Sequence, residues 1–382
     1  MTILCSAALL AGLLLLGVIE RRARDRACAA IPIRIHVNGT RGKSTVTRLI
    51  AAALREAGVR TVAKTTGTEA RLILPDGSER PVRRRAPASV REQLWCLREA
   101  RRLHAEAVVV ECMAVDPVLQ AVSEHEMIRS TIGVITNARL DHAEAMGATV
   151  EEVAAALAAT VPDRGTAVVG PTESLAAIER AAGTRGSRVV RAEPDVGIAG
   201  GFGEAGGGPA GEHAGIVLAV ARVLGVPDET ARRGMRRAAP DPGAMRTGEV
   251  GVAGRRVRYL DAAAANDPQS LGVLLESRGH DALFVFHHRQ DRPMRMRQFA
   301  NMPPWTRQAD ELLVTGDRPD WMTWRMLRRA LPGSRLAFAA PGRLADSLRR
   351  RLREPAGPSL LVFCGNTKGF RRDAVLAAVG RG

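Results

Sequence analysis

The stretch of sequence that decides the fold reads Ile33-Arg34-Ile35-His36-Val37-Asn38-Gly39-Thr40-Arg41-Gly42-Lys43-Ser44-Thr45. It combines an apolar strand, a glycine-containing loop and, from residue 46 on, a segment whose apolar residues have helical spacing. In this order the loop leads into the start of a helix, where backbone N–H groups attract an anion. The segment is therefore predicted to be a phosphate-binding loop that binds ATP.

Several residues of this loop have their own roles in the predicted phosphate site. Gly39 and Gly42 let the backbone approach a phosphate closely, Lys43 supplies a mobile positive charge, and the Ser44 hydroxyl can bind Mg²⁺. The strict G-x-x-x-x-G-K-[ST] pattern is not met, because Val37 stands at its first glycine position. The alternative interpretation is a glycine-rich turn that precedes a helix and binds nothing.

Length and composition favour a globular protein with two domains. The chain has 382 residues, 46% of them apolar, and a formal net charge of +16 that comes almost entirely from arginine. Such a charge favours polyanionic partners, although an arginine-rich surface without a specific partner is an equal alternative. Aromatic residues make up only 3% of the chain, so few side chains could stack on the bases of a single-stranded nucleic acid. No nucleic-acid partner is therefore expected.

The amino terminus carries 18 uncharged residues, from Thr2 to Ile19, followed by four arginines before residue 27. A helix of this length spans roughly 27 Å, which predicts one transmembrane helix that anchors the protein in the cell membrane. Because the arginines follow the apolar run, the catalytic domains are predicted to face the cytoplasm. A buried helix or an uncleaved signal are the alternatives. The five scattered cysteines, without a C-x-x-C pair, suit a reducing compartment.

Beyond this segment, strand-like and helix-like segments alternate, which predicts an α/β fold with parallel sheets. A first, ATP-binding domain is expected over residues 27–245 and a smaller α/β domain over 246–382, after an anchor and basic flank over 1–26. The predicted strands are 59–63, 107–110, 131–135, 166–169 and 188–190 in the first domain, and 257–261, 283–286, 312–315, 336–339 and 360–363 in the second.

Polar side chains follow two of the predicted buried strands. Glu111 ends the apolar run 107–110, and Asn137, Asp141 and His142 follow the strand at 131–135. Ligands collect at the carboxyl edge of an open parallel sheet, so these groups are candidates to bind nucleotide or metal. Taken one at a time, each has a structural alternative, such as a helix cap or an exposed loop residue.

Together these motifs resemble those of the Mur ligase superfamily, and most closely the membrane-associated ligase subunit of poly-γ-glutamate (capsule) synthase. The likeness rests on Asn38 to Thr45, Lys64-Thr65-Thr66-Gly67-Thr68, Glu111-Cys112-Met113-Ala114, Ser123-Glu124-His125, Thr136 to His142, Asp241-Pro242-Gly243-Ala244, Asn266-Asp267-Pro268, Arg289-Gln290-Asp291-Arg292 and Gly365-Asn366. The resemblance implies a Mur-type ATP-binding domain, a second α/β ligase domain and an enzyme that forms amide bonds at the expense of ATP.

Site residues follow from the resemblance. It implies that the loop from Gly39 through Thr40, Arg41, Gly42, Lys43 and Ser44 to Thr45 binds ATP together with Asn137, that Lys43, Glu111 and His142 are catalytic, and that Ser44, Glu111 and His142 hold Mg²⁺. Arg246, Asp261 and Asn266 would add nucleotide contacts from the second domain. The implied partners are glutamate, the growing poly-γ-glutamate chain and small membrane subunits of the synthase.

The chain also departs from the superfamily pattern. There is no lysine between Lys64 and Lys368, so the carbamylated lysine that many Mur ligases use for a second metal is missing. The domain that binds uridine-linked precursors is missing as well. The segment 212–216 lacks the asparagine often found there, so no adenine contact is assigned. The alternatives are another Mur-type ligase similar to folylpolyglutamate synthetase, a non-catalytic ATP-binding scaffold, and a nucleic-acid-binding ATPase.

Overall fold

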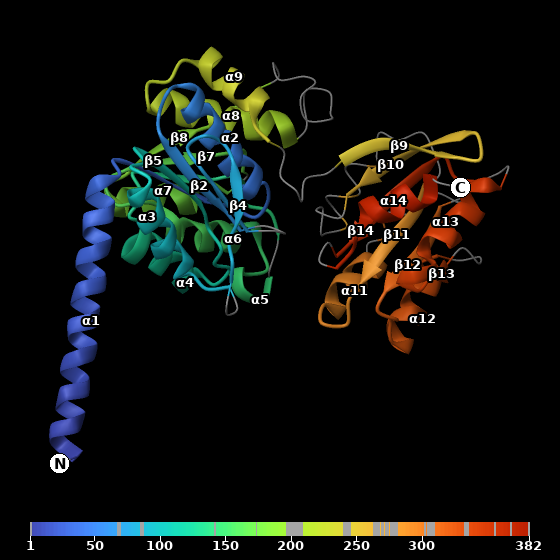
Figure 1. Ribbon diagram of the computed structural model, residues 1–382, viewed down its shortest axis with the longest axis horizontal. Helices are drawn as coiled ribbons and strands as arrows, with labels where there is room; N and C mark the ends of the chain where they lie inside the picture. Colours follow the sequence, from blue (N-terminus) through green and yellow to red (C-terminus); the bar gives the residue numbers. More distant parts are fainter. Residues whose placement is uncertain are drawn as a thin grey trace. The chain divides into compact units, whose positions relative to one another are not determined.

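A computed structural model describes residues 2–66, 70–84, 88–140, 143–172, 174–195, 209–239, 246–262, 268, 271, 275, 282–301, 303, 310–331, 336–354, 357–366 and 369–380. The chain divides into two compact units, Met1–Asp241 and Pro242–Gly382 (Figure 1). The predicted boundary after residue 245 falls at the end of the segment 240–245, which lies outside the described residues.

The first unit is built on an eight-stranded sheet with the order β4-β3-β2-β5-β1-β6-β7-β8. The six strands from β2 to β8 in this order are parallel, and β3 and β4 extend the sheet by antiparallel pairing. The strands are β1 (Ile33–Asn38), β2 (Thr61–Thr65), β3 (Arg71–Ile73), β4 (Glu79–Pro81), β5 (Ala107–Glu111), β6 (Ile132–Ile135), β7 (Thr166–Val169) and β8 (Arg188–Arg191).

Helices cover both faces of this sheet. Ile35 and Val37 of β1 pack into one core with α2, α8 and α9, while Val108 and Val110 of β5 pack on the other face with α3. This packing explains why β5 is apolar at successive positions, since both faces of a parallel sheet are buried. The helices are α2 (Lys43–Glu56), α3 (Glu92–Arg102), α4 (Pro117–Ala121), the π-helical η1 (Val122–Ile128), α5 (Ala143–Met146), α6 (Val150–Leu157), the 3₁₀ turn η2 (Ala158–Thr160), α7 (Ala176–Arg185), α8 (Pro209–Val223) and α9 (Asp228–Arg237).

A six-stranded sheet with the order β13-β12-β11-β14-β10-β9 forms the second unit. Only β9 runs antiparallel to its neighbour among these described strands, and two apolar clusters lie on the two faces. Its elements are β9 (Arg246–Val252), β10 (Arg255–Asp261), β11 (Ala282–His288), α11 (Pro293–Asn301), β12 (Glu311–Gly316), α12 (Trp321–Ala330), β13 (Leu336–Phe338), the 3₁₀ turn η3 (Pro341–Arg343), α13 (Leu344–Arg353), β14 (Leu360–Gly365) and α14 (Arg372–Gly380).

The predicted α/β class with parallel sheets is confirmed. The antiparallel strands β3, β4 and β9 were not predicted. The first two are only three residues long, and a segment this short carries too little alternation to be recognised. β9 contains two glycines, Gly248 and Gly251, which weaken a strand pattern.

The amino-terminal residues form the long helix α1 (Thr2–Ala30), which Figure 1 shows extending away from the sheet of the first unit. Leu10, Leu13 and Leu16 on this helix are between 59% and 63% exposed. Within the described part of the chain, however, no helix has both the length and the apolar character that crossing a membrane requires. The predicted transmembrane helix is therefore not supported. The uncharged run ends at Ile19, and charged residues fill the next turns of α1.

Candidate active site

The loop between β1 and α2 is shaped by its two glycines. Gly39 has φ +130° and Gly42 has φ +79°, a region that favours glycine. A Cβ on Gly39 would lie 2.1 Å from Oγ1 of Thr136, and one on Gly42 would lie 2.1 Å from Nε2 of His213. Both positions therefore require glycine on two grounds, backbone conformation and close packing.

Lys43 and the start of α2 face this loop. Gly42 is the left-handed N-cap residue of α2, and its carbonyl accepts the first helical hydrogen bond from Val46 N at 2.9 Å. The Lys43 side chain folds back, and its Nζ donates to the carbonyl oxygens of Gly39 at 2.6 Å and Thr40 at 3.4 Å. The ammonium group thus lies over the loop at the helix N-terminus, the position where a phosphate group is attracted.

Ser44 and Glu111 meet at the carboxyl edge of the sheet, although the sequence separates them widely. The Ser44 hydroxyl donates to Oε2 of Glu111 at 2.8 Å, and the backbone N–H of Thr66 donates to the same oxygen at 2.6 Å. Glu111 is only 3% exposed. A hydroxyl and a carboxylate oxygen at this separation form a pair of hard oxygen ligands, which suits Mg²⁺.

Asn137 holds the other side of the loop. Its Oδ1 accepts hydrogen bonds from Oγ1 of Thr40 at 2.6 Å and from the backbone N–H of Arg41 at 3.1 Å, and its Nδ2 donates to the Arg41 carbonyl at 3.2 Å. Thr136 adds a hydrogen bond from its hydroxyl to the same carbonyl. Two consecutive residues after β6 thus fix the conformation of residues 40 and 41. Thr45 lies in the first turn of α2, half-buried.

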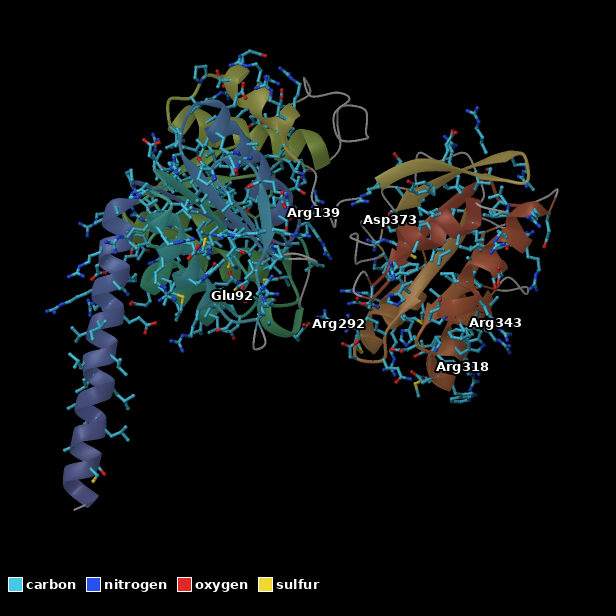
Figure 2. All side chains as sticks on the ribbon, viewed as in Figure 1. Glu92, Arg139, Arg292, Arg318, Arg343 and Asp373 are labelled. Atoms are coloured by element: carbon cyan, nitrogen blue, oxygen red, sulfur yellow. The ribbon has the colours of Figure 1, made fainter. Side chains whose placement is uncertain are left out.

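His213 is a part of this site that sequence reasoning missed. It lies on α8, and its Nε2 packs against Gly42. Burial lowers the pKa of His213 to about 4, with a further contribution from Arg139. Arg139, labelled in Figure 2, also forms an ion pair of 3.0 Å with Glu212 beside it. The resemblance pointed to the segment 212–216 but assigned no contact there, and the packing of α8 on α2 is what brings His213 to the loop.

The first turn of α3 is hydrogen-bonded to the main chain of Glu111. Nε2 of Gln93 donates to the main-chain carbonyl of Glu111 at 3.1 Å. The preceding residue, Glu92, lies with its Oε2 3.2 Å from Nζ of Lys64, which is completely buried, and Glu92 also pairs with Arg84 at 2.7 Å. Burial raises the pKa of Glu92, but Arg84 and Lys64 outweigh this effect and the pKa is lowered. Adjacent residues of one helix therefore hold the ends of both β2 and β5.

One predicted metal ligand and one predicted nucleotide contact cannot be placed. His142, like its neighbour Asp141, and Asn266 lie outside the described residues. Among the residues that the structure describes, no group of three or more His, Cys, Asp or Glu side chains could hold a metal ion. Of the three predicted metal ligands, the structure describes Ser44 and Glu111, which are hydrogen-bonded to each other.

Arg246 and Asp261 belong to the second unit and lie side by side in it. They are register partners in the antiparallel pair of β9 and β10. Arg246 forms an ion pair of 3.7 Å with Asp373, labelled in Figure 2, and Nε of Arg372 lies 2.7 Å from Oδ2 of Asp261. The two predicted nucleotide contacts are thus neighbours, each paired with one of two consecutive residues at the start of α14.

Comparisons with known proteins agree on one family. Residues 37–194 match the Mur ligase middle domain, and residues 247–378 match the poly-gamma-glutamate synthase CapB C-terminal domain. The chain is 33% identical over 369 residues to the PGA synthase CapB of Bacillus subtilis (strain 168), covering 89% of each protein. The chain belongs to the CapB family. It is also 38% identical over 313 residues to the capsule biosynthesis protein CapB of Bacillus anthracis, covering 75% of this chain and 64% of that protein.

Membership in the CapB family confirms the predicted superfamily and the predicted enzyme class, an ATP-dependent amide ligase of poly-γ-glutamate synthesis. Solved structures share the fold. MurF from Acinetobacter baumannii has a TM-score of 0.63 at 15% identity, covering 97% of this chain and 80% of that one. Folylpolyglutamate synthase from Thermotoga maritima has a TM-score of 0.61 at 13% identity, covering 94% and 92%.

Proposed function

We propose that this CapB-family ligase phosphorylates the γ-carboxylate of one glutamate unit with ATP and joins it to the amino group of another. A carboxylate oxygen attacks the γ-phosphorus of ATP, ADP leaves, and an acyl phosphate forms. The amine nitrogen then attacks the acyl carbon, inorganic phosphate leaves, and the nitrogen loses a proton to give the γ-amide. The substrates are thus glutamate and the growing poly-γ-glutamate chain.

The observation that supports this function best is the meeting of Ser44 and Glu111 beside the Lys43 loop. The donor set fits Mg²⁺, which usually takes one or two protein oxygens and completes its shell with water and substrate phosphates. We propose that Ser44 and Glu111 hold Mg²⁺, with His142 as a third ligand. When bound, this ion would neutralise phosphate charge during transfer.

The remaining site residues have binding and positioning roles in this proposal. Lys43 exchanges the two carbonyl oxygens that it now contacts for the phosphates of ATP. Gly39, Gly42 and Thr45 line the loop, while Asn137 holds Thr40 and Arg41 in place through its hydrogen bonds to both residues. Arg246 and Asp261 contribute nucleotide contacts from the second unit.

Ligation can be tested with purified full-length protein, ATP, Mg²⁺ and radiolabelled glutamate, comparing wild type with Lys43→Ala. We expect glutamate-dependent ATP hydrolysis and labelled high-molecular-weight product from the wild type, and loss of both in the variant. Short labelled conjugates would instead support a ligase similar to folylpolyglutamate synthetase. Hydrolysis that ignores glutamate, with no labelled product, would contradict the proposal and favour the scaffold alternative.

Association with small membrane subunits of a synthase is proposed as a separate property of this chain. It can be tested by co-purification of the tagged protein from its native host. Recovery of the same small membrane proteins after mild detergent extraction would support it, and recovery of the ligase alone would contradict it.

A further inference from the structure

Two neighbouring cavities lie at the carboxyl-terminal end of α2, the helix that begins at the phosphate-binding loop. One has a volume of about 450 Å³ and is lined by Arg48, Arg55, Arg237 and residues of the β3–β4 turn. The other, of about 470 Å³, shares Arg55, Pro75 and Asp76 with it. Arg55 follows Lys43 by about 18 Å along the helix axis, so these cavities are separate from the ATP site.

Two arginines on one face of α2 bring incompletely bonded guanidinium groups to the first cavity. Arg48 is only 3% exposed, and it donates from Nη2 to Glu79 at 3.0 Å, yet its Nε is buried without a hydrogen-bond partner. Arg55 lies two helical turns further on, and its Nη1 is likewise buried without a partner. Burial lowers the pKa of Arg55. A buried guanidinium N–H that lacks a hydrogen-bond partner is costly, which indicates that an acceptor belongs here.

The carboxylates around Arg55 are already engaged. Glu79 accepts from Arg48, Glu56 accepts from Arg233 at 3.2 Å and Arg237 at 2.8 Å, and Asp76 accepts from the backbone N–H and hydroxyl of Ser78 at 2.9 and 2.7 Å. In the described part of the chain, no carboxylate of the cavity lining forms a hydrogen bond with Arg55. The lining carries three arginines and three carboxylates, and Arg55 is the arginine of this set that has no hydrogen-bonded carboxylate among the described residues.

The turn between β3 and β4 leaves room for a ligand beside this charge. Gly77 has φ +86°, and a Cβ there would lie 3.7 Å from Nε of Arg55, so the guanidinium lies over the glycine. The acceptor chemistry that matches an arginine fork is a carboxylate or a phosphate. Because Glu56, Asp76 and Glu79 also line the cavity, they repel a doubly charged phosphate more strongly than a singly charged carboxylate.

We propose that the cavity around Arg55 binds a carboxylate of the glutamate polymer and so retains the growing chain between additions. This inference rests on the proposed function, since the polymer is its product. A chain held at a second point rebinds the ATP site as an intramolecular event, which raises its effective concentration there. The cavity is then a determinant of product length, and it takes no part in the ligation chemistry.

The test compares Arg55→Gln with Arg98→Gln, which removes the same charge from an exposed position on α3 outside both cavities. Binding of a fluorescent γ-linked glutamate decamer to the full-length protein is followed by anisotropy. Loss of one charge-assisted contact is expected to weaken binding about tenfold in Arg55→Gln and to leave Arg98→Gln close to wild type. Arg55→Lys, which keeps the charge without the fork, should bind with intermediate affinity, and thermal melting checks that each variant is folded.

Product length is the second readout. Arg55→Gln should give shorter polymer at an unchanged initial rate of glutamate-dependent ATP hydrolysis with a short acceptor. Equal decamer affinity and equal product length in Arg55→Gln and Arg98→Gln would overturn the inference. So would displacement of the decamer by inorganic phosphate at lower concentration than by glutarate, which would identify a phosphate site. If the wild type makes no polymer, the proposed function fails, whereas the decamer measurement still decides whether the cavity binds glutamate carboxylates.

Discussion

Nζ of Lys64 lies 3.2 Å from Oε2 of Glu92, so a completely buried ammonium group has its counter-ion at the first turn of α3. The next residue of that turn, Gln93, donates to the main chain of Glu111. Lys64 in turn lies two residues before Thr66, whose N–H binds the Glu111 carboxylate. A single helix end therefore connects the two strand ends that orient this carboxylate.

Glu92→Gln is expected to destabilise the protein by about 3 kcal/mol, because it leaves the buried Lys64 charge without its counter-ion. Urea denaturation followed by circular dichroism measures the free energy of unfolding. Glu99→Gln is the matched control on the same helix, where the carboxylate pairs with the more exposed Arg80 and Arg102, and it should cost less than about 1 kcal/mol. Equal losses of unfolding free energy in the two variants would show that the buried Lys64–Glu92 pair stabilises the protein no more than an exposed ion pair does.

Glu111→Gln should weaken divalent-metal binding to the ATP-loaded protein by at least about tenfold and reduce ligation at limiting Mg²⁺. Manganese binding, measured by electron paramagnetic resonance, checks the affinity independently of turnover. Ser44→Ala should act in the same direction, since its hydroxyl is the second oxygen of the pair. Chelation of divalent metal should stop turnover in the wild type. Unchanged manganese affinity in both variants would argue that the metal binds elsewhere.

Asn137→Ala is expected to weaken ATP binding about tenfold, because the loop loses the side-chain hydrogen bonds to Thr40 and Arg41 that fix its conformation. Isothermal titration calorimetry with a non-hydrolysable ATP analogue measures this affinity. Thr40→Val removes one of those hydrogen bonds and should show a smaller loss. An affinity equal to that of wild type in Asn137→Ala would mean that the loop keeps its shape without this residue.

His36 gives stability a defined pH dependence. This residue is completely buried, and its Nδ1 lies 2.8 Å from Oε2 of Glu124, whose other oxygen accepts from the backbone N–H and hydroxyl of Ser130. Burial lowers the pKa of His36, but Cys112 and Glu124 more than offset it and raise the pKa to about 9.

Since the folded pKa is higher than the unfolded value, the stabilisation from His36 is complete below about pH 6.5 and is lost as pH rises through about 9. The loss should be about 3 kcal/mol in the free energy of unfolding. Denaturation curves at pH 6.5, 8 and 9.5 measure it, and His36→Gln should flatten the dependence in this window. A wild-type stability that is constant between pH 6.5 and 9.5 would contradict a charged His36.

Much of the fold was readable in the sequence because it depends on local periodicity. The runs around Val109 and Val134 are apolar at successive positions, as strands buried on both faces must be, and they form β5 and β6. Where the local signal was weak, prediction failed. The short β3 and β4 gave no pattern, yet their turn at Gly77 forms the wall of the cavity over Arg55.

By itself, the sequence determined the phosphate-binding loop, the strand-end position of Glu111 and the family, because each depends on residues that lie close together in the chain. Only the tertiary structure decided which distant groups meet. The parallel order β2-β5-β1-β6 brings Thr66, Glu111, Ser44 and Asn137 to one edge. The packing of α8 on α2 places His213 over Gly42. Such contacts follow from strand order and helix packing, which the whole chain sets through burial of apolar surface and which no local motif encodes.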